Sequence, residues 1–181
     1  GLQNLKVHSK LLQIKRILEG KTQYLTYIGT GNFNEATATI YTDVALLTAD
    51  KEISLEVSRV FGMLENNLER HAFRHLLVSP FNTRRKLLAL IEREIKFAKA
   101  KKPASIRLKF NNLTDVKMID KLYAASKAGV QIELIIRGIC CLKPGVKGLS
   151  EHITAISIVD RYLEHTRFFI FGNGGKPEYF I

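Results

Sequence analysis

A histidine and a lysine two residues apart, His8 and Lys10, form the pattern in this chain with the clearest chemical potential. On a β-strand, residues i and i+2 point to the same face and lie about 6.5 Å apart. A neutral imidazole can attack phosphorus, and a nearby ammonium group can neutralise the oxygens of a phosphoryl group in transfer. The pair taken alone would fit an edge-strand histidine beside a solvated lysine equally well, so its meaning depends on the neighbouring motifs.

A glycine-rich loop is the second motif, with the sequence G-T-G-N-F-N at positions 29–34. Glycine backbone N–H groups are free of Cβ crowding, and asparagine side chains add amide donors, so such a loop can cradle an anion. We therefore predict a phosphate-binding loop formed by Gly29, Thr30, Gly31, Asn32 and Asn34.

The His8 pattern has a weak echo near the other end of the chain. His165 and Arg167 again form a His-x-cation pair that runs into an apolar strand and then into a glycine turn at 172–175. Arginine in place of lysine keeps its proton and can hold a phosphate with two hydrogen bonds. In the first copy a glycine loop follows the second strand, whereas here Ile181 is reached first, so we expect the chain to be part of a longer protein.

The elements that would position these residues can be outlined from hydrophobic periodicity and turn signals. Before the middle of the chain we expect a hairpin of strands 5–14 and 23–28, a strand over 43–47, a helix capped by Asp50 and a strand over 76–78, with a unit boundary near 70–75. After it we expect helices over 83–101 and 115–128, and strands over 106–110, 131–136, 153–159 and 167–171. The alternation predicts βαβ units and a mainly parallel sheet, with Arg137 at the carboxyl end of a strand, where ligands collect.

The composition is that of a folded basic protein. The 181 residues are 46% hydrophobic and 25% charged, which argues against wholesale disorder, and no apolar run reaches the length of a membrane span. The formal net charge of +11 attracts anions, among them nucleic acid, anionic lipid and phosphates, without choosing between them. The only cysteines are adjacent, Cys140 and Cys141, which fits a reducing cytoplasm better than a disulfide framework.

The ordered motifs resemble one family over the whole chain. The pairing of H-x-K with a G-[ST]-x-N loop is similar to the phospholipase D superfamily. Within that superfamily, the longer segments resemble the long-chain polyphosphate kinase family: V-H-S-K (7–10), G-T-G-N-F-N (29–34), Y-T-D (41–43), L-L-T-A-D (46–50), L-Y-A-A-S-K-A-G-V (122–130), R-G-I-C-C-L-K-P-G-V (137–146) and R-Y-L-E-H-T-R (161–167).

This resemblance implies roles for particular residues. Members of the family transfer the terminal phosphate of ATP reversibly to inorganic polyphosphate through a phosphohistidine, which matches His8, with Lys10 as a phosphate clamp. Tyr41, Arg137 and His165 match residues that bind ATP, and His165 is also a catalytic residue. Two His motifs, one from each half, would meet at one site.

The resemblance also implies an architecture and partners. We expect an α/β fold with phospholipase D-like mixed or parallel sheets flanked by helices. Residues 1–75 would be the C-terminal part of a first catalytic domain, and 76–181 the N-terminal part of a second. ATP, ADP and polyphosphate would be the substrates, with Mg²⁺ bound by ligands upstream of residue 1. We expect the full-length protein to be a cytoplasmic homo-oligomer, with peripheral membrane association, no nucleic-acid partner, and no activity in this chain alone.

Two other functions remain open at this point. A phospholipase D-like phosphodiesterase would use the same histidines on lipid or nucleic acid, with water as the final acceptor. A polyanion-binding module would bind in a salt-dependent way without turnover.

Three further groups have simpler interpretations. His71 and His75 have helical metal-ligand spacing, but no third ligand is near in sequence, which favours a solvated linker. The pair Cys140–Cys141 fits small packing residues. The pair Asn111–Asn112 follows a strand and could either reach a phosphate or form a turn.

Overall fold

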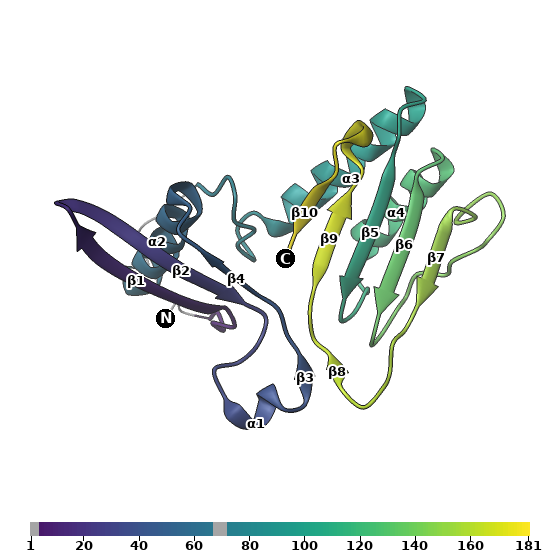
Figure 1. Cartoon of the computed structure of the whole chain (residues 1–181). Coiled ribbons are helices and arrows are strands. Elements are labelled where there is room, and N and C mark those ends of the chain that lie inside the picture. The colour runs from purple at the N-terminus through teal and green to yellow at the C-terminus, as the bar shows by residue number, and fades with distance from the viewer. Residues whose placement is uncertain (1–3, 67–71) are drawn as a thin grey trace. The chain divides into compact units, whose positions relative to one another are not determined.

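A computed structural model describes residues 4–66 and 72–181. Its contacts divide the chain into two compact units, Gly1–Thr83 and Arg84–Ile181 (Figure 1). Within the described residues, no helix combines the length and the apolar character that crossing a membrane requires. His71, one of the two histidines with metal-ligand spacing, lies outside the described residues.

The first unit is built on an antiparallel sheet with the strand order β1-β2-β4. Its elements are β1 (Lys10–Leu18), β2 (Lys21–Gly29), α1 (Glu35–Ala38), β3 (Tyr41–Thr42), β4 (Ala45–Thr48) and α2 (Lys51–Glu65). The predicted hairpin is confirmed, and its turn residues Glu19 and Gly20 have the positive φ angles, 50° and 72°, that a two-residue hairpin loop requires.

The first strand begins later than predicted. β1 pairs with β2 from Lys10 onward, because its partner there is Gly29, where β2 ends and the chain turns into the glycine loop. Residues 5–9 have no ladder partner in this sheet, and His8 therefore precedes the strand instead of standing on it.

Polar side chains join helix α2 to the hairpin. Asp50 caps the helix as predicted, since its side chain accepts from the N–H of Ile53 at 2.9 Å. The buried Thr26 hydroxyl donates to the Ser54 hydroxyl at 2.9 Å, and Gln13 donates to both Thr26 and the Ser54 carbonyl. These bonds fix the helix against the strands that carry Lys10 and the glycine loop.

The predicted strand over 76–78 is wrong. The side chain of Glu56, which is 4% exposed, accepts from three successive backbone N–H groups, those of Arg74, His75 and Leu76, at 2.7–3.0 Å. The N–H of Val78 donates to the side chain of Asn82. These side chains satisfy the backbone donors that a strand ladder would otherwise satisfy.

The second unit has a five-stranded mixed sheet with the order β10-β9-β5-β6-β7. Its elements are α3 (Thr83–Lys99), β5 (Ser105–Phe110), α4 (Val116–Lys127), β6 (Gln131–Ile136), β7 (Ile153–Ile156), β8 (Leu163–Glu164), β9 (Phe168–Phe171), the 3-10 turn η1 (Asn173–Gly175) and β10 (Glu178–Phe180). The predicted helices and the four predicted strands of this half are confirmed, with shorter ends.

The sheet is less parallel than the alternation predicted. β5, β6 and β7 are parallel, whereas β9 is antiparallel to β5, and β10 is antiparallel to β9. The chain leaves β7, passes through β8 and returns to the sheet as β9 in the opposite direction, beside β5 and not beside β7. The consequence for the site is that β9 begins at the edge where β5 ends.

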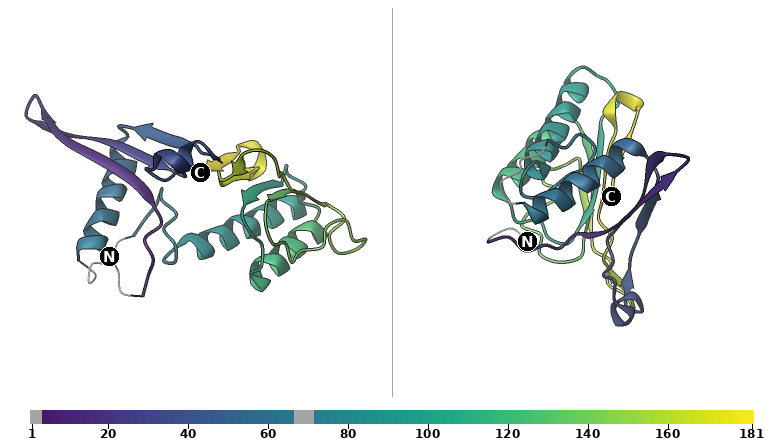
Figure 2. Two further views of the ribbon diagram at one scale, coloured as in Figure 1. Left: turned by 90° about the horizontal axis from the view of Figure 1, so that it is seen from below. Right: turned by 90° about the vertical axis from the view of Figure 1, so that its left-hand side faces the viewer.

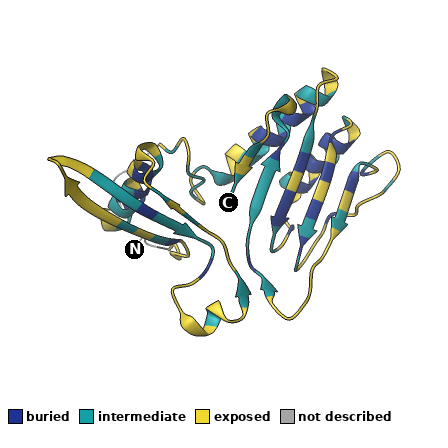
Figure 3. Ribbon diagram, in the orientation of Figure 1, coloured by how far each residue is buried: buried dark blue, intermediate teal, exposed yellow. Residues whose placement is uncertain are grey.

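One face of this sheet carries the core. Helices α3 and α4 lie on the same side of the sheet (Figures 1 and 2). They pack on alternate residues of the strands, so that buried and exposed positions alternate along β5 and β6 (Figure 3). The residues that fill the core include Ile91, Ile95, Ile106, Leu108, Leu122, Ile132 and Leu134. This packed layer fixes the strands in place, and the polar side chains described below lie at their ends.

Candidate functional site

In the first unit, the hairpin register brings the His-x-Lys motif to the glycine loop. Lys10 pairs directly with Gly29, the last residue of β2 and the first residue of the loop. The Lys10 ammonium lies 3.1 Å from Nδ1 of His8 and donates to the His8 carbonyl oxygen at 2.8 Å. Lys10 is 9% exposed, whereas His8 is exposed. The lysine therefore contacts both the histidine ring and the strand position opposite the first loop residue, although not through the strand geometry expected from spacing alone.

The loop itself is braced against the segment that leads into β4. The Thr30 hydroxyl donates to Oδ1 of Asp43 at 2.8 Å, and the Thr30 N–H donates to the Val44 carbonyl at 3.0 Å. A Cβ on Gly31 would lie 2.6 Å from Oδ2 of Asp43, so only glycine fits at this position. Asp43 thus supports the loop.

The remaining predicted residues of this unit have distinct environments. Oδ1 of Asn34 accepts from the N–H of Thr37 at 3.0 Å, which caps helix α1. The Asn34 N–H donates to the carbonyl of Asn32, whose side chain is exposed. Tyr41 lies half-buried in β3. Both amide side chains of the predicted loop are exposed, and the Oδ1 acceptor of Asn34 serves the fold as a helix cap.

In the second unit, one edge of the sheet gathers the polar residues that follow or precede strands. Arg137 directly follows β6, Asn111 directly follows β5, and Arg167 directly precedes β9. Lys109, near the end of β5, pairs with Phe168, the first residue of β9. The antiparallel direction of β9 therefore places Arg167 at the edge that also carries Arg137. His165, 7% exposed, lies two residues before Arg167.

This edge has an excess of positive charge. Burial, and secondly the positive charge of Arg137, lower the pKa of the Arg167 guanidinium below its ordinary value. Two guanidinium groups close enough to repel each other, in a half-buried setting, favour a bound anion that would neutralise both. Within the described residues, no carboxylate forms an ion pair with either Arg137 or Arg167.

Lys109 is a contributor that the sequence reasoning missed. Its ammonium donates to Glu164 at 2.6 Å and lies 6.0 Å from the centre of the Phe168 ring. Glu164 is the residue before His165, so the ion pair ties the His165 segment to the end of β5. One signal in the sequence could have pointed to Lys109, since it is a charged residue next to the end of a predicted strand.

A metal centre would need several ligating side chains close together. In residues 4–66 and 72–181 no three His, Cys, Asp or Glu side chains gather in a way that could hold an ion. The magnesium ligands were expected upstream of residue 1, so that expectation stays a prediction.

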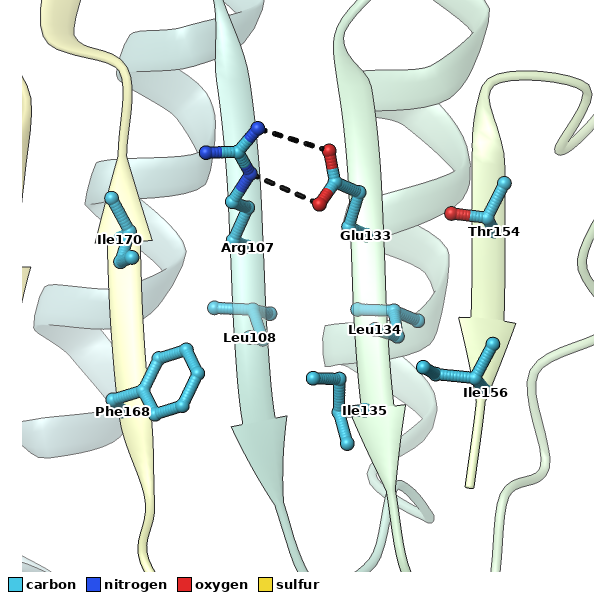
Figure 4. Close-up of a pocket in the computed structure, with 9 residues that line it drawn as sticks. All are labelled: Arg107, Leu108, Glu133, Leu134, Ile135, Thr154, Ile156, Phe168 and Ile170. Atoms are coloured by element: carbon cyan, nitrogen blue, oxygen red, sulfur yellow. Dashed lines mark hydrogen bonds and ion pairs between the residues drawn. The ribbon is translucent and has the colours of Figure 1, made fainter. Parts of the chain in front are cut away.

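A hollow of about 490 Å³ lies elsewhere on the second unit, on the sheet face opposite α3 and α4 (Figure 4). Its lining is largely apolar, and its two charged side chains, Arg107 and Glu133, pair with each other at 3.0 and 3.2 Å. None of the predicted site residues lines it. The candidate residues therefore lie at two places, the glycine loop of the first unit and the strand ends of the second, and not in this hollow.

Comparison with known proteins assigns both halves of the chain. Residues 1–70 match the family model "Polyphosphate kinase C-terminal domain 1", and residues 76–181 match "Polyphosphate kinase C-terminal domain 2". The chain belongs to the polyphosphate kinase family. Among polyphosphate kinases it is 53% identical over 181 residues to the protein of Vibrio vulnificus (strain YJ016) and 50% identical over 177 residues to that of Escherichia coli (strain K12). The match with the Vibrio vulnificus protein covers 100% of this chain, and the match with the Escherichia coli protein covers 98%. Each match covers 26% of the relative.

A solved polyphosphate kinase has the same fold. The crystal structure of polyphosphate kinase from Porphyromonas gingivalis matches with a TM-score of 0.88 and 43% identity, over 99% of this chain and 30% of that one. The predicted phospholipase D-like α/β fold with mixed sheets is thereby confirmed. The chain spans about a quarter of the length of the polyphosphate kinases that it resembles in sequence.

Proposed function

We propose that the longer protein carrying this chain is an ATP–polyphosphate phosphotransferase that works reversibly through a phosphohistidine at His8. A ring nitrogen of His8 attacks the terminal phosphorus of ATP, the bond to the bridging oxygen breaks, and ADP leaves. A terminal oxygen of inorganic polyphosphate then attacks the phosphoryl group, and the nitrogen–phosphorus bond breaks. The ring's other nitrogen keeps its proton throughout, so both steps balance without an added base.

The contact between Lys10 and His8 is the single observation that carries this proposal. The ammonium lies 3.1 Å from a ring nitrogen, at the residue that pairs with the start of the glycine loop. A cation at that distance neutralises charge on a phosphoryl group bound to the ring, and phosphoryl transfer depends chiefly on positioning and such neutralisation. His8 is exposed, so solvent reaches this residue.

The second unit supplies the nucleotide contacts in this proposal. Arg137 and Arg167 bind phosphate oxygens of ATP, in keeping with the uncompensated positive charge that they share. His165 acts as an acid or a charge stabiliser near the phosphates, and Tyr41 of the first unit contacts the nucleotide. A guanidinium that binds a phosphate through two hydrogen bonds contributes more binding free energy than one neutral hydrogen bond does.

The partners of the longer protein follow from the same proposal. ATP, ADP and polyphosphate are its substrates, and magnesium accompanies the nucleotide. The net charge of +11 suits a polyanionic product. A cytoplasmic homo-oligomer with peripheral membrane association and without a nucleic-acid partner remains part of the proposal, as does the inactivity of this chain by itself.

The test compares two reactions of the full-length protein. The full-length protein is incubated with ATP and polyphosphate. In separate reactions without ATP, it is incubated with a lipid phosphodiester and with a nucleic-acid phosphodiester. ATP-dependent lengthening of polyphosphate, reversed by excess ADP and absent from His8→Ala, supports the proposal. Release of an alcohol from a phosphodiester, with no ATP dependence, would replace it by a phospholipase D-like phosphodiesterase.

A further inference from the structure

The inference concerns the two asparagines at the end of β5, and it rests on the proposed function. Asn111 and Asn112 hold the loop that follows β6. The Asn111 carbonyl accepts from the N–H of Gly138 at 2.9 Å, and the Asn112 side chain accepts from the N–H of Ile139 at 2.8 Å. A Cβ on Gly138 would meet Oδ1 of Asn112 at 2.3 Å, which shows how closely this loop is held.

Asn111 adds a contact to a guanidinium that Asn112 does not make. Its Oδ1 accepts from Nε of Arg137 at 3.0 Å. The register explains this contact. Phe110 pairs with Ile136 at the end of the parallel β5–β6 ladder, so the residues that follow, Asn111 after β5 and Arg137 after β6, lie side by side. Within residues 4–66 and 72–181, no hydrogen bond or ion pair takes up the two terminal nitrogens of Arg137.

The same unit holds other arginines differently. Arg84 makes two hydrogen bonds to the carboxylate of Asp115, through Nε and Nη2, and Arg107 does the same with Glu133. In both pairs a carboxylate occupies the fork and cancels the charge. Arg137 is instead held through Nε by a neutral amide, which fixes the direction of the guanidinium, leaves its charge uncancelled and leaves its two terminal nitrogens available.

We infer that Asn111 is a positioning residue for Arg137, selected as an amide so that Arg137 is oriented without being neutralised. The ligand class is a chain phosphate, in ATP or in polyphosphate, bound by the terminal nitrogens of Arg137 beside Arg167. The inference goes beyond the resemblance, which assigns a role to Arg137 and none to Asn111. It predicts that the chemical nature of residue 111 matters more than the presence of a hydrogen bond there.

Two substitutions at residue 111 separate orientation from charge. Asn111→Ala removes the acceptor and leaves Arg137 charged but unrestrained. Asn111→Asp keeps an acceptor at the same place, but its carboxylate occupies the fork and adds a negative charge beside the phosphates. A residue that merely built a turn would tolerate aspartate better than alanine, because aspartate is a favourable turn residue. The inference predicts the opposite order for phosphate binding.

The experiment measures equilibrium binding of ATP, and of tripolyphosphate as a nucleotide-free probe, to the full-length protein and its variants. The dissociation constant should rise about tenfold in Asn111→Ala, the effect of one hydrogen bond to a charged group. It should rise at least about tenfold more in Asn111→Asp. In the background of Arg137→Ala, Asn111→Ala should add less than about twofold, because its effect passes through the missing guanidinium.

Asn112→Ala is the matched control, since it loosens the same loop without touching Arg137. Thermal unfolding of each variant separates loss of folding from loss of binding. The inference is overturned if aspartate binds as well as alanine or better, if Asn112→Ala weakens binding as much as Asn111→Ala, or if the loss persists undiminished in Arg137→Ala.

The outcomes also distinguish this inference from the proposed function. A wild-type protein that binds tripolyphosphate but neither binds ATP nor transfers its phosphate would remove the proposed function, and the order of the two Asn111 variants would still be decided with tripolyphosphate. A wild-type protein that binds neither probe would remove both.

Discussion

Replacing Lys10 by methionine should slow the formation of the phosphohistidine about a hundredfold. Methionine has nearly the length of lysine without its charge, so the substitution removes the ammonium that lies 3.1 Å from the His8 ring. Because Lys10 is 9% exposed, solvent screens this charge only partly.

The magnitude follows from the distance. A phosphoryl group on the ring would bring its oxygens within roughly 4 Å of the ammonium, where two unit charges attract by about 4 kcal/mol at an effective dielectric constant of about 20. Only the part of this attraction that grows between bound ATP and the transition state changes the rate. If about two thirds of it does, the barrier rises by roughly 2.7 kcal/mol, which is about a hundredfold in rate.

The assay is rapid quenching of the full-length protein with γ-labelled ATP at saturating concentration, with acid-labile protein phosphate as the readout. Lys15→Met is the matched control, because Lys15 is an exposed lysine of the same strand and its loss changes the net charge equally. Lys10→Arg, which keeps the charge, should recover part of the rate. A Lys10→Met protein that is labelled within about threefold of the Lys15→Met rate would refute the reasoning.

Two further predictions concern the fold that supports the site. In Glu56→Ala, the backbone N–H groups of residues 74–76 lose charge-assisted hydrogen bonds worth about 1.5–3 kcal/mol each, so their hydrogen exchange should accelerate at least about tenfold; unchanged exchange there would contradict the clamp. The pKa of Asp115 is lowered from its ordinary value of 3.8, first by the hydrogen bond from Arg84 and then by the N–H of Met118, so its contribution to stability is present above that value and disappears as the pH falls through the lowered pKa. Asp115→Asn should therefore be less stable than wild type at about pH 7 and equal to it in strong acid, as measured by urea unfolding across the pH range; a difference that stays constant across that range would exclude this cause.

Local signals were sufficient for the elements that carry their own boundaries. Asp50 was recognisable as a cap, and it accepts from the N–H three residues on, so α2 begins where predicted. The hairpin turn at Glu19 and Gly20 was equally local. Each of these features depends on residues within one turn of the chain.

Contacts between residues distant in sequence account for the errors. The apolar run over 76–78 looked like a strand, but Glu56, about twenty residues earlier, takes up the backbone donors of residues 74–76. β9 turned out to be antiparallel to β5, because the chain reverses direction between β7 and β9 and a strand's direction leaves no mark on its own composition.

The same limit applies to the site. His8, Lys10 and the glycine loop could be chosen from residue type and spacing, and the roles of Tyr41, Arg137 and His165 came from the resemblance and remain predictions. The contact of Arg137 with Asn111 depends on the register of β5 against β6, and the burial of Arg167 depends on the direction of β9. Neither can be read from the sequence before the sheet is known.

The central claim is that His8 carries the phosphate between ATP and polyphosphate. The most direct test labels the full-length protein with γ-labelled ATP and digests it under alkaline conditions, in which a phosphate on histidine is stable. The label is located by peptide mapping before and after polyphosphate is added. The account predicts an acid-labile, base-stable phosphate on the peptide containing His8, which moves to polyphosphate in the chase and is absent from His8→Ala. A label that remains in His8→Ala, or one that maps to His8 but does not move to polyphosphate, would contradict it.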